Sequence, residues 1–318
     1  MTSDSNLFVD EPGAGYLPLY EGKMVQAYDH RAASVVVNRA NVHRQAQPEI
    51  TTDEEHKDPE YGPTPRYWVS AEEVNAGLGS WRRKWLIAFK DVTAATNERT
   101  AIGAVIPRVG AGHNLPLILL DDKVSVDQSV LLLANFNALS FDYIVRQKIG
   151  GNHLTFGILR QLPFLPPHTY RDDDGQYVTS RVLELVYTSS DLKAWAEDLA
   201  YNSSPFAWDE PARATIRAEL DAYYAHLYGL TRDELRYILD PKDVFGEDFP
   251  SETFRVLKER EIKEYGEYRT QRLVLEAFDR LADSPRFRDE MPKRVSAFEV
   301  PKGQAADPFG HAGVQVCS

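Results

Sequence analysis

The sequence is poor in cysteine and in long apolar runs. Its one cysteine, Cys317, can form no internal disulfide and offers no cysteine-based metal site. The longest apolar run, residues 129–145, contains two asparagines and an aspartate and is too short to span a membrane. The first 15 residues show neither the basic nor the apolar region of a signal peptide. We therefore expect a cytoplasmic protein with no membrane partner.

Common catalytic and ligand-binding motifs are also missing. No Gly-x-x-x-x-Gly-Lys phosphate loop occurs, and the Gly-x-Gly within Arg108–Asn114 lacks a third glycine and predicts a hairpin turn. The eight histidines show no metal-ligand spacing, and the Asp29–His30 pair has no Gly-x-Ser-x-Gly companion. Asp172–Asp174 lacks the later glutamate of a calcium loop and predicts a solvated turn. We assign no catalytic or metal-binding residue, and no Asp…Glu-x-Lys nuclease pattern is visible.

Charge is unevenly distributed along the chain. The formal net charge of -12 argues against bulk affinity for nucleic acid. Residues 1–65 and 169–318 carry −6 and −9, whereas residues 66–168 carry +3. The middle third is thus the one basic part of the sequence. Charge alone does not distinguish a functional basic surface from chance variation.

The apolar pattern divides the chain into an α/β part and a helical part. Residues 1–16 predict a disordered N-terminus, and 45–66 predict a long exposed loop. Short apolar segments predict strands at 84–90, 100–106, 115–120 and 153–159, and helical spacing predicts one buried helix at 127–148, capped by Asp127. The predicted architecture is an α/β domain at 17–168, a mixed sheet with a buried helix.

The remainder predicts a mainly helical domain at 169–283 and a weakly ordered tail at 284–318. Helices are expected at 180–201, 209–230, 231–239 and 251–281. Pro211 in a first turn, Gly229 as a stop, and Thr231 with Glu234 as a capping box mark their ends.

Three clusters in the basic third combine cations with hydrogen-bonding groups. They are "WRRKW" at 81–85, "TNERT" at 96–100 and "RQKIGGNH" at 146–153. Reading a DNA sequence requires donors and acceptors at base edges and cations at phosphates. Each cluster also has a structural interpretation. "WRRKW" fits a strand edge protected by its charges, and Arg99 fits an ion pair with Glu98 or Asp91.

The same residues carry a resemblance to a known family. "LYEGKMVQAYDHR", "RRKWLIAFKDVTAATNERTAIGAVIPRVGAGHNLPLILL", "LLLANFNALSFDYIVRQKIGGNHLTFGILRQLPFLPP" and "LYGLTRDELRYILDP…ETFRVLKEREIKEYGEYRTQRLVLEAFDRL" resemble the C-terminal portion of type IIG-like adenine-specific DNA methyltransferases, of restriction-modification and phage-defence systems. The likeness spans about residues 17–281. Residues 84–167 also resemble the target recognition domain of type I specificity subunits.

This resemblance implies a DNA target-recognition-like domain. The family's S-adenosylmethionine loop and its Asn-Pro-Pro-Tyr motif do not occur in this sequence, so methyl transfer is not assigned to it. We expect no cofactor in this chain, and S-adenosylmethionine in a methyltransferase catalytic domain or subunit that acts with it on double-stranded DNA. The chain is then a separate specificity subunit or a fragment of a larger enzyme.

Roles in DNA binding follow from side-chain chemistry. The residues expected to hold phosphates are Lys23, Arg82, Arg83, Lys84 and Lys148. The expected base-edge contacts are Arg99, Arg146, Asn152 and His153, with Gly150 and Gly151 shaping the loop. The alternative is a non-catalytic scaffold subunit of a defence complex, whose basic cluster contacts an acidic partner.

Overall fold

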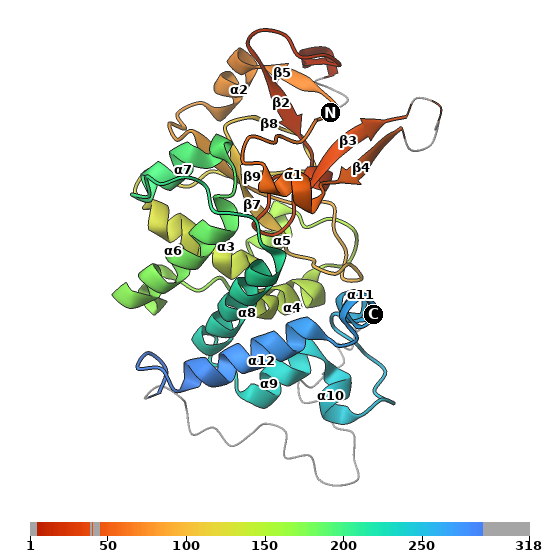
Figure 1. The fold of residues 1–318 in the computed structure, drawn as a ribbon, viewed down its shortest axis with the longest axis vertical. Helices are drawn as coiled ribbons and strands as arrows, with labels where there is room; N and C mark the ends of the chain where they lie inside the picture. Colours follow the sequence, from red (N-terminus) through yellow and green to blue (C-terminus); the bar gives the residue numbers. More distant parts are fainter. Residues whose placement is uncertain (1–4, 39, 41–44, 289–318) are drawn as a thin grey trace, which may run out of the picture.

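The protein has a mixed α/β fold with small sheets in its N-terminal half and helices in its C-terminal half (Figure 1). The computed structural model describes residues 5–38, 40 and 45–288. Buried residues from both halves belong to one hydrophobic core. Among the helices in these ranges, none has the length and apolar character needed to cross a membrane.

The described strands form three small sheets where one mixed sheet was expected. The first contains β1 Phe8–Val9, β5 Trp68–Ser70, β2 Tyr16–Tyr20 and β8 Gly110–Ala111, in that order. The second pairs β3 Ala33–Val37 with β4 Ala46–Ile50, and the third has the order β7 Gly103–Pro107, β6 Trp85–Phe89, β9 Leu117–Ile118. Among the described strand pairs, only β2 and β8 run parallel. The β3–β4 hairpin projects from the body (Figure 1).

The predicted buried helix is present but broken into two. Helix α3 spans Val126–Asn137 and α4 spans Leu139–Lys148, with extended backbone at Ala138 between them. The break turns the Asn137 side chain toward strand β7, where it bonds both the N–H and the carbonyl of Gly103 at 2.8 and 3.0 Å. Ser125, not Asp127, caps α3 through a capping box.

Three other segments differ from the sequence prediction. Residues 153–159 form no strand: they contain the short helix α5 Phe156–Leu159, capped by Thr155. The expected loop at 45–66 contains β4 and α1 Asp53–Lys57, whose first turn Thr52 caps. The expected disordered N-terminus contains a 3-10 turn, Ser5–Leu7, and β1, while residues 1–4 lie outside the described range. Within 45–66, polar residues that suggest a loop cap α1 or pair in β4 with β3.

The helical half matches the prediction more closely. Its elements are α6 Asp172–Val186, α7 Lys193–Asp198, α8 Glu210–Leu227, α9 Arg232–Leu239, α10 Pro241–Phe245, α11 Arg255–Tyr265 and α12 Arg269–Ala282. The capping box of Thr231 and Glu234 is confirmed, and Gly229 after α8 has a φ of 70°. An α2 helix, Ala71–Leu78, lies in the N-terminal half.

The acidic triplet is the main correction in this half. Asp172–Asp174 is the first turn of α6, and Asp174 is fully buried rather than solvated. Arg286 and Tyr223 donate to its carboxylate, so its charge is paired. Part of the expected loose tail thus packs on α6, and Phe287 is buried beside it. Residues 289–318 lie outside the described range.

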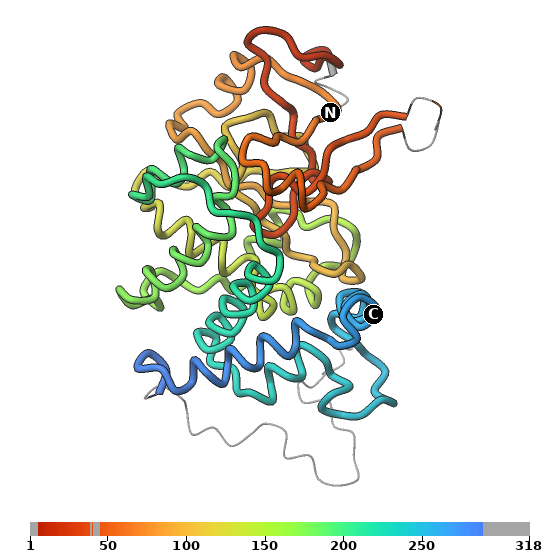
Figure 2. Tube along the Cα trace, in the orientation of Figure 1, coloured from red at the N-terminus to blue at the C-terminus, as the bar shows by residue number. Residues whose placement is uncertain are grey.

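Hydrogen bonds join residues 30, 31 and 59 to the segment between α6 and α7, which runs beside them (Figure 2). Arg31 is fully buried and donates to the Thr188 carbonyl at 3.0 Å. His30 Nε2 lies 3.0 Å from the Asp191 carboxylate, and Ser190 N donates to Pro59 O at 2.9 Å. These contacts fix the segments before β3 and after α1 against the helical half.

Candidate nucleic-acid interface

Strand β6 has cations at both ends. Arg82, Arg83 and Lys84 precede the strand, and Lys90 follows it directly. The five extended residues between these groups span about 16 Å. The two groups therefore belong to two separate surfaces.

The surface before β6 combines cations with carboxylates. Arg82 and Lys84 are exposed, whereas Arg83 is half-buried against two tryptophan rings and bonds a backbone carbonyl. A hollow of about 320 Å³ beside them is also lined by Glu197 and Asp198. The carboxylates offset the local positive charge, which makes this surface the weaker of the two for phosphate.

Arg146 lies inside the protein. Its side chain is 4% exposed and pairs with fully buried Asp142, with Nε 2.8 Å from Oδ1. Its other four N–H groups donate to the carbonyls of Ala95, Thr253, Asn97 and Glu98. All five donors of the guanidinium are thus occupied. This placement gives Arg146 a structural role and leaves it no group for a base edge.

Arg99 is held in a similar way. It donates to the Asn137 carbonyl at 3.1 Å and to Asp221 at 3.3 Å. Burial acts to lower the pKa of Arg99, but Asp221 and Asp142 outweigh it and the pKa is raised. The charge of Arg99 is thus stabilised by carboxylates of the protein. The ion pair expected with Glu98 or Asp91 is made with Asp221 instead.

The loop after α4 is exposed between two apolar anchors. Its exposed residues are Lys148, Gly150, Gly151, Asn152 and His153. Ile149 and Leu154 are buried on either side. His153 Nδ1 lies 2.9 Å from Asp91 Oδ2, and the Asn152 carbonyl accepts from Thr93 N at 3.1 Å. The loop is therefore attached to the end of β6, with the side chain of Asn152 and the ammonium of Lys148 toward solvent.

The two loop glycines have room around them. A Cβ on Gly150 or Gly151 would meet no atom within 4 Å, and neither residue has a positive φ. The conformation of the free protein therefore does not require glycine at these positions. The small size of both residues leaves the loop backbone open to a ligand.

Lys23 lies at the base of the projecting hairpin. Its ammonium is 3.1 Å from the Glu21 carboxylate and 3.2 Å from the Ala46 carbonyl. Gly22 beside it packs against the Lys90 side chain, because a Cβ on Gly22 would lie 3.8 Å from Lys90 Cγ. The chain neighbour of Lys23 thus contacts Lys90.

Sequence reasoning missed Lys90. It closes the apolar segment at 84–90, so it was interpreted only as the end of a strand. Burial lowers its pKa to about 8. Within the described part of the chain, no hydrogen bond or ion pair engages its ammonium. The signal available in the sequence was a cation placed where a buried strand ends.

We call Lys23, Lys90, Asp91, Asn152 and His153 the β6-end surface. The contacts above bring these residues together from three separate segments. Lys148, Gly150 and Gly151 lie on the loop that leads to it. Arg99 and Arg146 do not contribute side chains to it, and the Arg82–Lys84 group lies at the opposite end of β6.

A buried serine and a buried histidine also meet an exposed aspartate, but in the wrong arrangement for hydrolysis. His30 Nε2 lies 3.2 Å from Ser189 Oγ and 3.0 Å from Asp191. A catalytic histidine uses one ring nitrogen for each partner, whereas both contacts here use the same nitrogen. Ser189 is also buried, so these residues join the two halves and do not form an active site.

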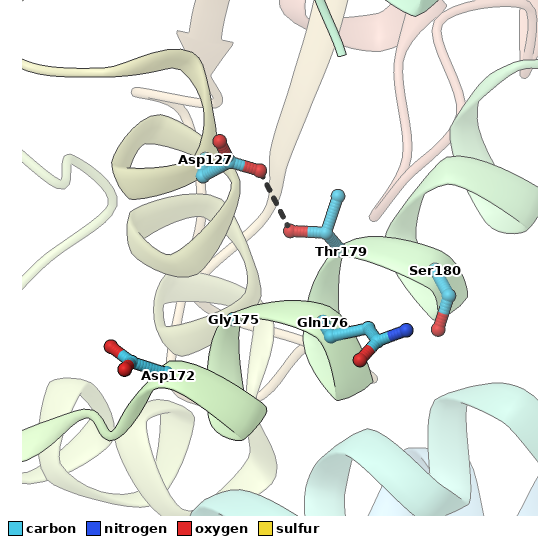
Figure 3. A pocket seen from close by; sticks show the side chains of 6 residues that line it. All are labelled: Asp127, Asp172, Gly175, Gln176, Thr179 and Ser180. Atoms are coloured by element: carbon cyan, nitrogen blue, oxygen red, sulfur yellow. Dashed lines mark hydrogen bonds between the residues drawn. The ribbon is translucent and has the colours of Figure 1, made fainter. Parts of the chain in front are cut away.

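A hollow of about 490 Å³ lies between the first turn of α3 and the N-terminal part of α6 (Figure 3). Its lining residues are Asp127, Asp172, Gly175, Gln176, Thr179 and Ser180. It contains no cation and none of the residues expected to bind DNA, so it does not extend the interface. Across residues 5–38, 40 and 45–288, no three histidine, cysteine, aspartate or glutamate side chains form a group able to hold a metal ion.

Comparison of the chain with protein-family models, with curated proteins and with solved structures gave no match. The function is therefore inferred from the residues of the chain and from the sequence resemblance.

Proposed function

We propose that this protein is the DNA sequence-recognition portion of an adenine-specific methyltransferase of a restriction-modification or phage-defence system. A catalytic chain or domain with S-adenosylmethionine would supply the chemistry. The observation that carries the proposal is the exposed segment Lys148–His153 in the basic third of the chain, which His153 joins to Asp91, the residue after Lys90.

The β6-end surface offers both kinds of contact that DNA recognition needs. Lys23, Lys90 and Lys148 supply ammonium groups for phosphates. Asn152 supplies an amide that can donate and accept at an adenine edge, and His153 offers its second ring nitrogen. The backbone of the two glycines is accessible between them. Phosphate contacts would position the loop, and Asn152 would read a base.

A binding titration tests this proposal. The measurement is fluorescence anisotropy of labelled duplex DNA, with the chain alone and co-purified with its methyltransferase, between about 50 and 200 mM salt. We expect the Lys148→Ala variant to weaken binding of all sequences and to reduce the salt slope by about one. We expect Asn152→Ala to weaken only the preferred sequence. Arg280→Ala is the matched control, since Arg280 is exposed on α12 and pairs with Glu219.

Failure of wild-type protein to bind DNA at the lower salt, both alone and with the methyltransferase, would sink the proposal. Equal effects of Lys148→Ala and Arg280→Ala would show that only net charge matters. In that case the loop is not the interface.

One observation favours the scaffold alternative. The projecting β3–β4 hairpin exposes Val36 at 45%, Val37 at 43% and Ile50 at 69%. Apolar side chains on a projecting ribbon suit contact with a protein more than with phosphates. A Val36→Ser/Ile50→Ser variant that loses the methyltransferase but keeps DNA affinity would assign assembly to the hairpin and recognition to the loop. Loss of assembly in Lys148→Ala, with DNA affinity unchanged, would support the scaffold role instead.

A further inference from the structure

Lys90 is fixed in place by three segments of the chain. Its backbone N donates to the Ile102 carbonyl at 2.9 Å, which continues the pairing of β6. The Asn114 carbonyl accepts from Asp91 N at 3.2 Å, and Asn114 Oδ1 accepts from Gly22 N at 3.1 Å. A Cβ on Gly22 would lie 2.6 Å from Asn114 O, so only glycine allows this approach. The stem of Lys90 is held in this packing.

The acids near Lys90 already have other partners. Glu21 pairs with Lys23 at 3.1 Å, and Asp91 pairs with His153 at 2.9 Å. Asp29 attracts Lys90 but is itself bonded to His56 at 3.2 Å and to the Arg31 N–H at 2.8 Å. The other titratable group on the adjoining segment 113–114 is His113, which is exposed. These three carboxylates are therefore already paired, and Asp29 attracts the Lys90 ammonium without forming an ion pair with it.

A half-buried cation without an anionic partner is costly for a folded protein. Such a group is a candidate for function, because a ligand can supply the missing charge. The neighbours of Lys90 show which ligand fits. Gly22, the chain neighbour of Lys23, packs on the stem of Lys90. Asp91, the residue after Lys90, holds the exposed loop at Gly150–His153. A second lysine and an exposed loop one residue away from these contacts favour an extended anion.

We propose that Lys90 is a phosphate-contacting residue whose Nζ binds a phosphodiester oxygen of the DNA backbone beside the Gly150–His153 loop. This inference rests on the proposed function and adds a contact that sequence reasoning did not assign. A compact ammonium fits a single phosphate oxygen as a point charge, without the paired geometry that arginine needs.

The burial of Lys90 makes this contact sensitive to pH. The pKa of the free protein's Lys90 is about 8, so the ammonium loses its proton as the pH rises through that value. Phosphate binds only the charged form. DNA affinity should therefore be full near pH 7 and fall above pH 8, by at most tenfold for each pH unit. An ordinary lysine, with a pKa of about 10.4, gives no such change in this range.

The experiment measures DNA affinity of the full chain by anisotropy from about pH 7 to pH 9.5. Three proteins are compared: wild type, Lys90→Arg and Lys90→Met, each checked for folding by circular dichroism. Wild type should lose affinity above pH 8 until it reaches the level of Lys90→Met. Lys90→Arg should keep its affinity, because arginine stays charged throughout this range. Lys90→Met should also reduce the salt slope by about one.

Two results would overturn the inference while leaving the proposed function standing. One is a Lys90→Met variant whose DNA affinity and salt slope equal those of wild type. The other is the same pH dependence in wild type and Lys90→Arg, which would place the titrating group elsewhere. Absence of DNA binding by wild type at every pH would overturn both the inference and the proposed function.

Discussion

Replacement of Arg146 by alanine should strongly destabilise the protein, although the residue was expected to contact DNA. The substitution removes one ionised partner from a pair in which the arginine is 4% exposed and Asp142 is 0% exposed. It also leaves the carbonyls of four residues without their donor. These carbonyls belong to the loop at 95–98 and to Thr253, both remote in sequence from α4. The substitution therefore removes hydrogen bonds that hold separate segments of the fold together.

The size of the effect follows from the burial of the pair. Breaking a buried ion pair by removing one partner costs about 3–5 kcal/mol, since it leaves an uncompensated charge. Folded domains are stable by only about 5–15 kcal/mol in total. Arg146→Ala should therefore remove a large share of the free energy of unfolding and lower the melting temperature by on the order of 10 °C. Arg146→Lys should be intermediate, because it keeps the charge but not the five-donor geometry.

Urea unfolding followed by circular dichroism measures this cost. Lys148→Ala is the matched control two positions away, since its side chain is exposed and its stability change should stay within about 0.5 kcal/mol. A double-mutant cycle with Asp142→Ala isolates the pair itself. The reasoning fails if Arg146→Ala unfolds like wild type while DNA affinity is lost, because the guanidinium would then have to face the ligand.

Two further stability predictions follow from close packing and from a buried acid. Gly150→Ala should change the free energy of unfolding by less than about 0.5 kcal/mol. Gly22→Ala should lower it by about 1–3 kcal/mol, since its Cβ would lie 2.6 Å from Asn114 O. Urea unfolding compares the two variants, and equal changes would contradict the packing argument. Arg286→Ala should cost about 3 kcal/mol at neutral pH. Burial acts to raise the pKa of Asp174, but hydrogen bonds from Arg286 and Tyr223 outweigh it and lower the pKa. The difference in unfolding free energy between wild type and Arg286→Ala should thus be full above the ordinary aspartate pKa of about 3.9. It should shrink as the pH falls through the lower pKa that Asp174 has in the native protein. A stability difference that does not change with pH would refute this pairing.

Sequence reasoning succeeded where the signals are local. The capping box of Thr231 lies at the start of α9 and the stop at Gly229 lies just after α8, and the structure has both. The break between α3 and α4 was not predictable in this way. It places Asn137 in contact with Gly103, which lies 34 positions away in the sequence, so no local pattern contains it. Asp174 is a similar case, because its partner Arg286 is 112 positions away.

Strand and helix patterns also overlap in short apolar segments. The run at 153–159 has the composition of a strand, yet the structure has a four-residue helix there, capped by Thr155. A segment of this length has too few residues to tell whether its apolar residues repeat every 2 residues, as in a strand, or every 3.6, as in a helix. The error affects the candidate site, because the Gly150–His153 loop leads into a helix and not into a sheet.

The segment Arg146–His153 shows why equal charges in a sequence differ in function. Arg146 and Lys148 each add one positive charge, but arginine offers five donors in a fixed plane and lysine offers three on a flexible stem. Carbonyls converging from separate segments suit the fixed plane, and Arg146 binds four of them together with Asp142. Lys148 remains in solvent. The arginine thus anchors α4, and that anchor supports the exposed loop that follows this helix. A test of DNA recognition should therefore alter the lysines and Asn152, because a change at Arg146 would remove the support of the loop together with any contact that it makes.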